Sequence, residues 1–193
     1  MVDCEPIYHN MEMKDGIVKS ILACFAHPDD ELGVGPLVSR AVAEGAQSTL
    51  ICATDGDVGT VDEKYLRGYD SIAALRLAEL ACATQAIGFT EVVTFGYRDS
   101  GMMGSADNAA PGSLWQAPLE EVTARVEEVM RRARPHVVIT FNTYGAYGHP
   151  DHIKIHQATV AAFQQRRARI EPQATSAAAG SGSVTFARPA ERA

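Results

Sequence analysis

Two short segments of the chain carry side chains that could do chemistry, and both follow the same plan. The letters HPDD stand at residues 27–30 after one apolar run, and HPDH stands at residues 149–152 after another. Proline suits the first turn of a helix, because its φ is close to helical and its missing N–H is not needed there. If each segment turns helically, its first and fourth side chains face the same way. Each segment therefore predicts a pair of donor side chains where a strand passes into a helix.

Together the two pairs offer the ligand types that zinc prefers. The four donors are His27, Asp30, His149 and His152. A catalytic zinc site binds nitrogen or carboxylate oxygen from three protein ligands and keeps one position open for water. Four protein ligands would close the metal, so we expect one of the four to serve chemistry instead. Helix capping explains either segment alone, since Asp and His commonly cap helix N-termini, but two matching segments favour a site.

Three further motifs carry weaker indications. His156 lies four residues after His152, but the segment lacks the Glu of the HExxH zinc motif, which favours a structural role for His156. The letters GVG at residues 33–35 lack the third glycine of a dinucleotide fingerprint, and the acidic residues 29–31 would repel a pyrophosphate. Nucleotide binding is therefore a weak alternative. The letters DGD at residues 55–57 are too few for a calcium loop and predict a turn.

The elements that must position the two HPD segments alternate along the chain. Short apolar runs predict strands, and longer segments with helical periodicity separate them. We predict strands at 17–26, 48–53, 91–95 and 136–141, and helices at 32–44, 65–87, 119–134 and 153–165. This order is typical of an α/β fold, a Rossmann-like three-layer sandwich with a mostly parallel sheet. Ligands of such sheets bind at the C-terminal ends of the strands, where both segments lie.

The chain of 193 residues is long enough for one domain with a sizeable core. We expect residues 1–16 to form a loose lead-in and residues 17–165 to form the domain. Residues 166–193 end in a segment dominated by small and polar residues, which predicts a disordered tail. The Gly- and Pro-containing stretch at 96–118 predicts a long loop, and loops of that length in compact domains are usually functional or mobile.

Composition excludes several classes of protein. The chain has 17 Lys+Arg against 24 Asp+Glu, a net charge of −7, which disfavours nucleic-acid binding. No apolar run approaches the ~20 residues that span a bilayer, and the first 16 residues lack the basic and apolar regions of a secretory signal. Cys24 and Cys52 lie in apolar runs, which predicts buried free thiols. We expect a cytoplasmic protein without nucleic-acid or membrane partners. The sequence leaves open whether the protein forms a homo-oligomer.

At the two HPD segments the sequence resembles the LmbE-like (PIG-L) family of zinc-dependent N-acetylglucosaminyl deacetylases. AHPDDE at 26–31 matches the family's first motif, and YGHPDH at 147–152 matches its second. Between them, RLAEL at 76–80 is similar to the family's RxxEL, although a surface ion pair explains it equally well. RDSGM at 98–102 is similar to the branch that acts on mycothiol precursors and conjugates. The resemblance covers roughly residues 19–163.

The resemblance implies a metal centre and a general base. His27, Asp30 and His152 would hold the zinc ion, and Asp29 would take a proton from the attacking water. Iron(II) or cobalt would also suit a site of two histidines and one aspartate. Glu31 belongs to the first motif, but the resemblance gives it no firm role.

The resemblance also implies roles for residues around the metal. His149 would stabilise the oxyanion or act as general acid, with Asp151 orienting its imidazole. Tyr147 would face the same developing charge. Arg76 and Asp99 match positions that contact substrate hydroxyls in the mycothiol-related branch.

The implied activity is removal of an acetyl group from an N-acetylglucosamine-type amide by metal-activated water. One alternative is an amidase that acts on a thiol–sugar conjugate. Another is a shortened, non-catalytic relative that holds metal or sugar, because members of the family commonly continue past the helix after the second motif. One departure from the family pattern is Asp57, which stands where the family usually has Glu in T-x-G-E-x-G.

Overall fold

The computed structural model describes residues 19–174. Its strands are β1 (Ser20–Phe25), β2 (Gln47–Thr54), β3 (Glu91–Tyr97) and β4 (Val137–Ile139). Its α-helices are α1 (Gly35–Ala43), α2 (Ile72–Ile87), α3 (Leu119–Ala133), α4 (Gly145–Gly148) and α5 (Pro150–Ala174). Three short 3₁₀ helices complete the set: η1 (Asp30–Gly33), η2 (Glu63–Leu66) and η3 (Ala106–Ala109).

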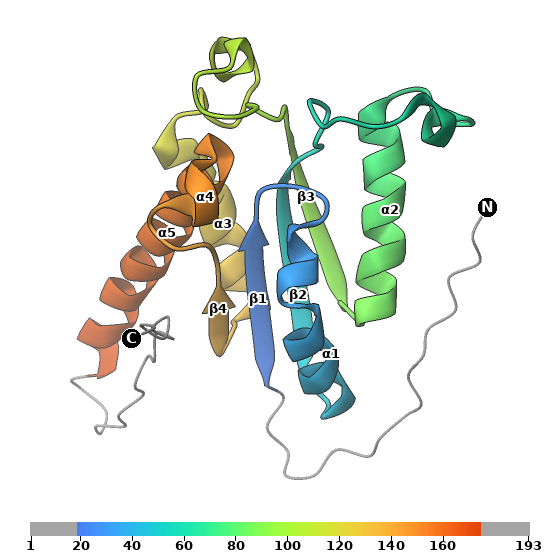
Figure 1. Cartoon of the computed structure of the whole chain (residues 1–193). Helices are drawn as coiled ribbons and strands as arrows, with labels where there is room; N and C mark the ends of the chain where they lie inside the picture. The colour runs from blue at the N-terminus through green and yellow to red at the C-terminus, as the bar shows by residue number, and fades with distance from the viewer. Residues whose placement is uncertain (1–18, 175–193) are drawn as a thin grey trace, which may run out of the picture.

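The four strands form one parallel sheet in the order β3-β2-β1-β4. Figure 1 shows α3 and α5 on one side of the strands and α2 on the other. Helix α1 lies with α2 and contacts β2. The predicted α/β fold with a parallel sheet between two helical layers is confirmed. Because all strands run the same way, their C-terminal ends meet at one edge, and the segments that follow them can share a site.

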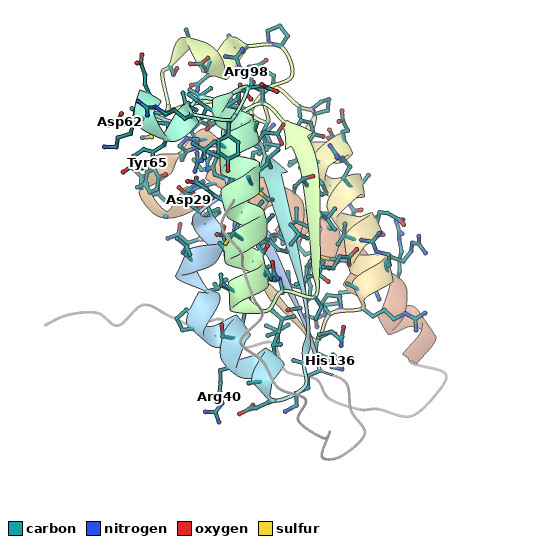
Figure 2. All side chains as sticks on the ribbon, turned by 90° about the vertical axis from the view of Figure 1, so that its right-hand side faces the viewer. Asp29, Arg40, Asp62, Tyr65, Arg98 and His136 are labelled. Atoms are coloured by element: carbon teal, nitrogen blue, oxygen red, sulfur yellow. The ribbon has the colours of Figure 1, made fainter. Side chains whose placement is uncertain are left out.

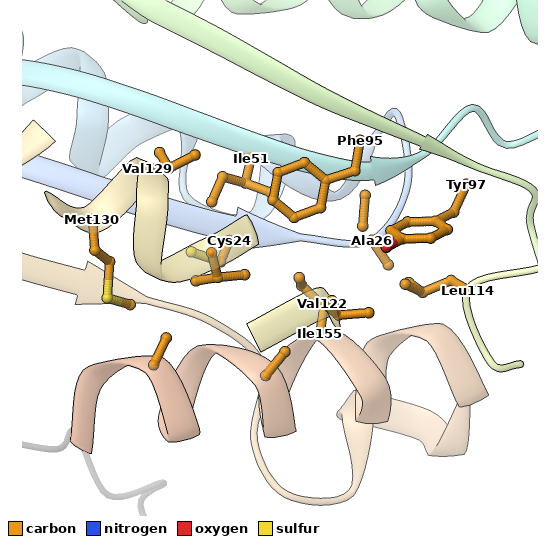
Figure 3. Packing of buried hydrophobic residues seen from close by; sticks show 14 of the residues in the cluster. Cys24, Ala26, Ile51, Phe95, Tyr97, Leu114, Val122, Val129, Met130 and Ile155 are labelled. Carbon is orange, nitrogen blue, oxygen red and sulfur yellow. The ribbon is translucent and has the colours of Figure 1, made fainter. Parts of the chain in front are cut away.

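The core lies on both faces of the central strands β1 and β2, which are buried along nearly their whole length as expected for a covered parallel sheet. One cluster joins the sheet to α3 and α5 (Figure 3), and a smaller one joins it to α2. The first cluster includes Leu22, Cys24, Ile51, Phe95, Val122, Val126, Met130 and Ile155. Burying a large apolar side chain contributes roughly 1.5–3 kcal/mol. Cys24 and Cys52 are buried free thiols, as predicted.

Helix α2 begins later than predicted. The sequence pattern placed its start at residue 65, but the structure has a separate 3₁₀ turn there and begins the helix at Ile72. The hydroxyl of Ser71 accepts a hydrogen bond from the backbone N–H of Ala74 at 3.1 Å. Gly68, at φ +91°, also interrupts a helical path. The serine cap and the glycine outweigh the helical periodicity of the preceding residues.

The ends of the last two elements also differ from the prediction. β4 covers Val137–Ile139 only, inside the predicted strand at 136–141. Helix α5 runs to Ala174, although the pattern predicted an end at residue 165, so the boundary of the predicted tail falls inside a helix. Residues 1–18 and 175–193, which hold the predicted lead-in and the rest of the predicted tail, lie outside the described residues. Within residues 19–174, no helix is both long and apolar enough to cross a membrane.

Candidate active site

The C-terminal edge of the sheet carries a polar pocket of about 430 Å³. Its lining residues are His27, Asp29, Val58, Gly59, Thr60, Arg76, Asp99, Gly101, Met102, Ser105, Tyr147 and His149. Figure 2 shows Asp29, Tyr65 and Arg98 toward this end of the molecule, and Arg40 and His136 at the other. Segments that follow all four strands contribute to the pocket, so residues far apart in the sequence meet there.

Three predicted metal ligands point their donor atoms at one place. Nδ1 of His27 lies 3.0 Å from Nε2 of His152. The Asp30 carboxylate lies 3.5 Å from Nδ1 of His27 and 3.4 Å from Nε2 of His152. Zinc–nitrogen bonds are about 2.0–2.1 Å long, so one ion can reach both nitrogens at this separation. The two imidazoles and one carboxylate thus fit a divalent cation with an open position.

Hydrogen bonds on the far side of each ring decide which nitrogen keeps its proton. Nε2 of His27 lies 3.2 Å from the Asp151 carboxylate, which can only accept, so Nε2 carries the proton. Nδ1 of His152 lies 3.2 Å from the carbonyl oxygen of Gly145, and it carries the proton for the same reason. The nitrogens that face each other are therefore the two that these hydrogen bonds leave free to offer a lone pair to a cation. Such a pair needs a proton or a cation between its members.

His149 has the opposite arrangement. Its Nδ1 accepts a hydrogen bond from the backbone N–H of Asp151 at 3.2 Å, so the proton of the neutral ring sits on Nε2. Ring nitrogens of His27, His149 and His152 do lie within 4.8 Å of one another, but His149 presents an N–H to the pocket. It is suited to donate a hydrogen bond, and Asp30 is the better third ligand.

A second group of buried donors lies on the other side of the His27 ring. Ligand atoms of His27, Asp99, His149 and Asp151 also fall within 4.8 Å of one another. Here both histidines present the nitrogen that keeps its proton. A cation would have to displace two protons from neutral rings, so this group is a poor metal site.

Burial and charge act differently on the three histidines. Burial lowers the pKa of His152 to about 4, which keeps its ring neutral near pH 7. Burial, followed by the charge of His27, also lowers the pKa of His149. Burial opposes protonation of His27 too, but hydrogen bonds to Asp151, Asp30 and Asp99 outweigh it and raise its pKa. The same concentration of negative charge that holds a proton at His27 also favours a cation.

The family resemblance has Asp151 orient the imidazole of His149. In the structure, the Asp151 carboxylate contacts His27 and Ser100. Only the backbone N–H of Asp151 reaches His149. The reason is local geometry: in the first turn of α5, the N–H two residues after His149 points back at its ring.

Asp29, the predicted general base, lies at a strained corner after β1. Its φ is +123°, a conformation that costs a non-glycine residue about 1–3 kcal/mol. Its backbone N–H donates to the carboxylate of Glu31 at 2.9 Å, and its own carboxylate accepts from Arg76 at 2.7 Å. Arg76 also donates to the carbonyl oxygen of Pro28. Burial raises the pKa of Asp29, and the charge of Arg76 opposes this.

Glu31 therefore gains a role that the sequence did not assign. Its side chain is buried and accepts the backbone N–H of Asp29 two residues earlier. Burial raises the pKa of Glu31. The three acidic residues of the first motif thus differ in their contacts. Asp30 faces the candidate metal ligands His27 and His152, Asp29 faces the pocket, and Glu31 holds the backbone of the corner.

Arg76 reaches Asp29 across two glycines of the loop after β2. A Cβ atom on Gly56 would lie 2.7 Å from Nη1 of Arg76, and one on Gly59 would lie 2.8 Å away. The carbonyl oxygen of Gly56 accepts from the same nitrogen at 3.4 Å. The turn predicted at residues 55–57 thus leaves room for the arginine, which lines the pocket but is engaged with Asp29.

Asp99, predicted to contact substrate, is buried at the pocket wall. Its carboxylate accepts from the backbone N–H of Gly101 at 2.8 Å and lies 3.6 Å from Nε2 of His27. Burial would raise the pKa of Asp99, but the hydrogen bond and charge of His27 lower it to about 2. Its backbone N–H donates to Asp57 at 2.8 Å, and Asp57 also pairs with Arg98 at 3.2 Å.

Tyr147 stands at the mouth of the pocket, and His156 lies away from it. The ring of Tyr147 is 57% exposed and its centre lies 6.1 Å from that of His149. The preceding Ala146, at φ +61°, directs the chain into this position. His156 bonds the carbonyl oxygen of Phe141 at 2.6 Å, a structural contact outside the pocket.

Comparison with known proteins gives relatives for most of the chain. Residues 22–163 match the family PIG-L, described as GlcNAc-PI de-N-acetylase. A protein of Acidothermus cellulolyticus named 1D-myo-inositol 2-acetamido-2-deoxy-alpha-D-glucopyranoside deacetylase is 40% identical over 161 residues, which cover 78% of this chain and 55% of that protein. A protein of the same name from Kineococcus radiotolerans is 42% identical, over 75% of this chain and 45% of that protein.

Solved structures share the fold. N,N'-diacetylchitobiose deacetylase from Pyrococcus horikoshii has a TM-score of 0.60 at 24% identity, over 76% of this chain and 49% of that one. A conserved protein from Thermus thermophilus has a TM-score of 0.52 at 28% identity, over 75% and 55%. The chain spans about half the length of the curated relatives it matches. With the match over residues 22–163, this chain belongs to the PIG-L family.

Proposed function

We propose that the chain is a metal-dependent N-deacetylase that hydrolyses the acetamide of an N-acetylglucosamine-type sugar. The observation that carries the proposal is the pair of facing lone-pair nitrogens on His27 and His152, 3.0 Å apart and beside the carboxylate of Asp30. Membership of the family and the names of the relatives support the reaction type.

His27, Asp30 and His152 would hold the metal ion, and zinc is our choice for it. Two imidazoles and one carboxylate suit zinc, and they also suit iron(II) or cobalt. When bound, such an ion acidifies a water molecule and polarises the carbonyl of the amide. This family's metal dependence agrees with the donor set at this edge of the sheet.

Asp29 is the general base of the proposed reaction. Its carboxylate lines the pocket, where it takes a proton from the water that attacks the acetyl carbon. The C–N bond of the amide then breaks, and the same carboxyl group returns the proton to the leaving nitrogen. The products are acetate and a free amino sugar. The raised pKa of Asp29 brings its basicity closer to the pH at which it works.

His149 stabilises the charge that develops on the acetyl oxygen. Its Nε2 carries a proton toward the pocket, because its Nδ1 is occupied by the N–H of Asp151. The hydroxyl of Tyr147, at the pocket mouth, is a second donor for the same oxygen. Arg76 and Asp99 face the same space and would bind hydroxyl groups of the sugar. We place the protein in the cytoplasm, on the strength of its composition.

Metal analysis paired with an acetate-release assay tests the proposal. The full chain should bind one divalent ion and release acetate from N-acetylglucosamine derivatives, and a chelator should abolish the release. A panel that adds thiol–sugar conjugates separates the deacetylase from an amidase of that class. A chain that binds metal but hydrolyses no amide in the panel would instead be a binding module.

A further inference from the structure

We infer that Ser100 is a positioning residue for the metal centre. Its hydroxyl and its backbone amide hold the Asp151 carboxylate in the orientation that keeps the proton of His27 on Nε2 and leaves Nδ1 free to bind metal. The inference rests on the proposed metal site. It assigns a task to the long loop after β3 that neither the motifs nor the relatives give it.

Ser100 holds both oxygens of the Asp151 carboxylate. The Ser100 hydroxyl donates to Oδ1, and the Ser100 backbone N–H donates to Oδ2 at 2.9 Å. The second oxygen also accepts from Nε2 of His27 at 3.2 Å. Ser100 and Asp151 are both 0% exposed, so water cannot replace a lost hydrogen bond. The terminal torsion of an aspartate is soft, and these contacts are what fix it.

A third group determines that the hydroxyl of Ser100 donates its hydrogen bond to Asp151. Its Oγ accepts the backbone N–H of Trp115 at 2.9 Å, so its single proton is left for Asp151. The side chain of Asn108 donates to the carbonyl oxygen of Ser100. Two residues of the loop, Asn108 and Trp115, thus fix one serine, and that serine fixes the carboxylate behind the metal ligand.

The same loop supplies a matched control. Ser113 is 1% exposed, and among the described residues its Oγ has no hydrogen-bond partner. Serine-to-alanine substitution at 113 therefore removes a buried hydroxyl from the same loop without touching Asp151. Any loss shared by the two sites is a loss of general packing, and a loss confined to residue 100 belongs to the contact with Asp151.

The test measures the dissociation constant for zinc by competition with a chromogenic chelator. Ser100→Ala should weaken zinc binding by up to about tenfold, since removing the direct partner of a metal-bound histidine typically costs 10–100-fold and Ser100 acts through that partner. Ser113→Ala should bind zinc as the unaltered chain does. Ser100→Cys keeps the size of the side chain with a weaker donor and should fall between the two. Ser100→Cys also tests the inference if Ser100→Ala does not fold.

A double-mutant cycle tests the route of the effect. Asp151→Ala removes the carboxylate but keeps the backbone N–H that faces His149. In that background Ser100→Ala should weaken zinc binding no further, because the two residues act in series. The absorption spectrum of the cobalt-substituted protein should shift in Ser100→Ala and stay unchanged in Ser113→Ala, since it reports the geometry of the ligands.

Four results would overturn the inference. If Ser100→Ala binds zinc as tightly as the unaltered chain, or if Ser113→Ala loses as much, Ser100 is not a positioning residue and the proposed function stands. If the two losses in the double-mutant cycle add in full, Ser100 acts through another group. An unaltered chain that binds no divalent cation overturns the proposed function and the inference together.

Discussion

At the scale of single residues, His27 and His149 are similarly buried but suited to different tasks. His27 keeps its proton on Nε2 because a carboxylate lies there, and His149 keeps its proton on Nε2 because a backbone N–H occupies its Nδ1. Both partners belong to Asp151. What distinguishes the two rings is whether their Nδ1 lone pair is free for a metal ion or already in use.

Alanine substitutions should separate these tasks. His152→Ala removes a proposed ligand, so the purified protein should lose most of its metal. His149→Ala should keep its metal and lose turnover by about 10²–10³-fold, as for other oxyanion donors. Metal content by mass spectrometry and acetate release on the same samples check both. Normal turnover in His149→Ala would contradict the role assigned to that ring.

The strained corner at Asp29 should depend on its glutamate neighbour. Glu31→Ala removes the carboxylate that accepts the backbone N–H of Asp29, and a hydrogen bond to a charged group contributes about 1.5–3 kcal/mol of stability. It should also lower kcat about tenfold or more, because the proposed general base, Asp29, loses its position. Glu31→Gln keeps an acceptor oxygen and should recover most of the turnover. Equal loss in both variants would show that charge, and not the hydrogen bond, is what matters there.

At the scale of elements, the loops that follow the strands each position a different side chain of the site. The loop after β2 leaves room for Arg76, and the loop after β3 holds Asp151 through Ser100. Helix α2 brings Arg76 to Asp29 from 47 positions along the chain. Each loop therefore positions a side chain of the site. That position can be changed without replacing a residue that faces the pocket.

Gly56→Ala should remove the room that the loop after β2 leaves for Arg76. Gly56 has φ +64°, and an added Cβ would lie 2.7 Å from Nη1 of Arg76. We expect a stability loss of about 1–2 kcal/mol from the backbone, and a fall in kcat/KM as the arginine is pushed from Asp29. Urea unfolding and acetate release measure the two effects.

Gly68→Ala is the control for that substitution. Gly68 has φ +91°, but no described atom lies within 4 Å of the position of its Cβ. It should therefore show the backbone cost and keep its activity. If both variants lose activity equally, the position of Arg76 is not the cause.

The sequence predicted the residues whose relations are local and missed those whose relations cross the fold. Spacing of three residues, together with the strand ends, predicted that His27, Asp30, His149 and His152 would meet at one edge of the sheet, and the family resemblance chose three of them as ligands. The serine that holds Asp151 lies 51 positions before it, and no spacing rule links the two. The contacts of the Asp151 carboxylate with His27 and Ser100 were not predicted, because the direction of a side chain depends on neighbours that only the folded chain supplies.

At the scale of the whole molecule, stability should fall in alkali because of the buried thiol at the centre of the sheet. Burial raises the pKa of Cys24 from its ordinary 9.0 to about 12. The unfolded chain releases this proton from about pH 9, while the folded protein keeps it to about pH 12. The contribution is therefore complete below pH 9 and is lost as the pH rises toward 12, by up to about 4 kcal/mol.

Cys24→Ala isolates this contribution. The free energy of unfolding is measured in urea from pH 7 to 11. At pH 7 that of the variant should be lower than that of the unaltered chain, because the substitution leaves a small cavity. It should then decline less steeply above pH 9 than that of the unaltered chain. Tyrosines, lysines and Cys52 titrate in both proteins and cancel in the difference. Parallel curves would mean that the thiol ionises in the folded protein without penalty.

The unusual backbone angle at Asp29 bears on attempts to move this chemistry to another scaffold. The six letters AHPDDE hold that angle only in part, because Arg76 from α2 also braces the corner from outside, in room that the glycines of the loop after β2 leave for it. A graft of the hexapeptide onto an unrelated α/β protein should relax to an ordinary helix start and turn its carboxylate away. A working transplant needs the arginine-bearing helix and the glycine turn as well.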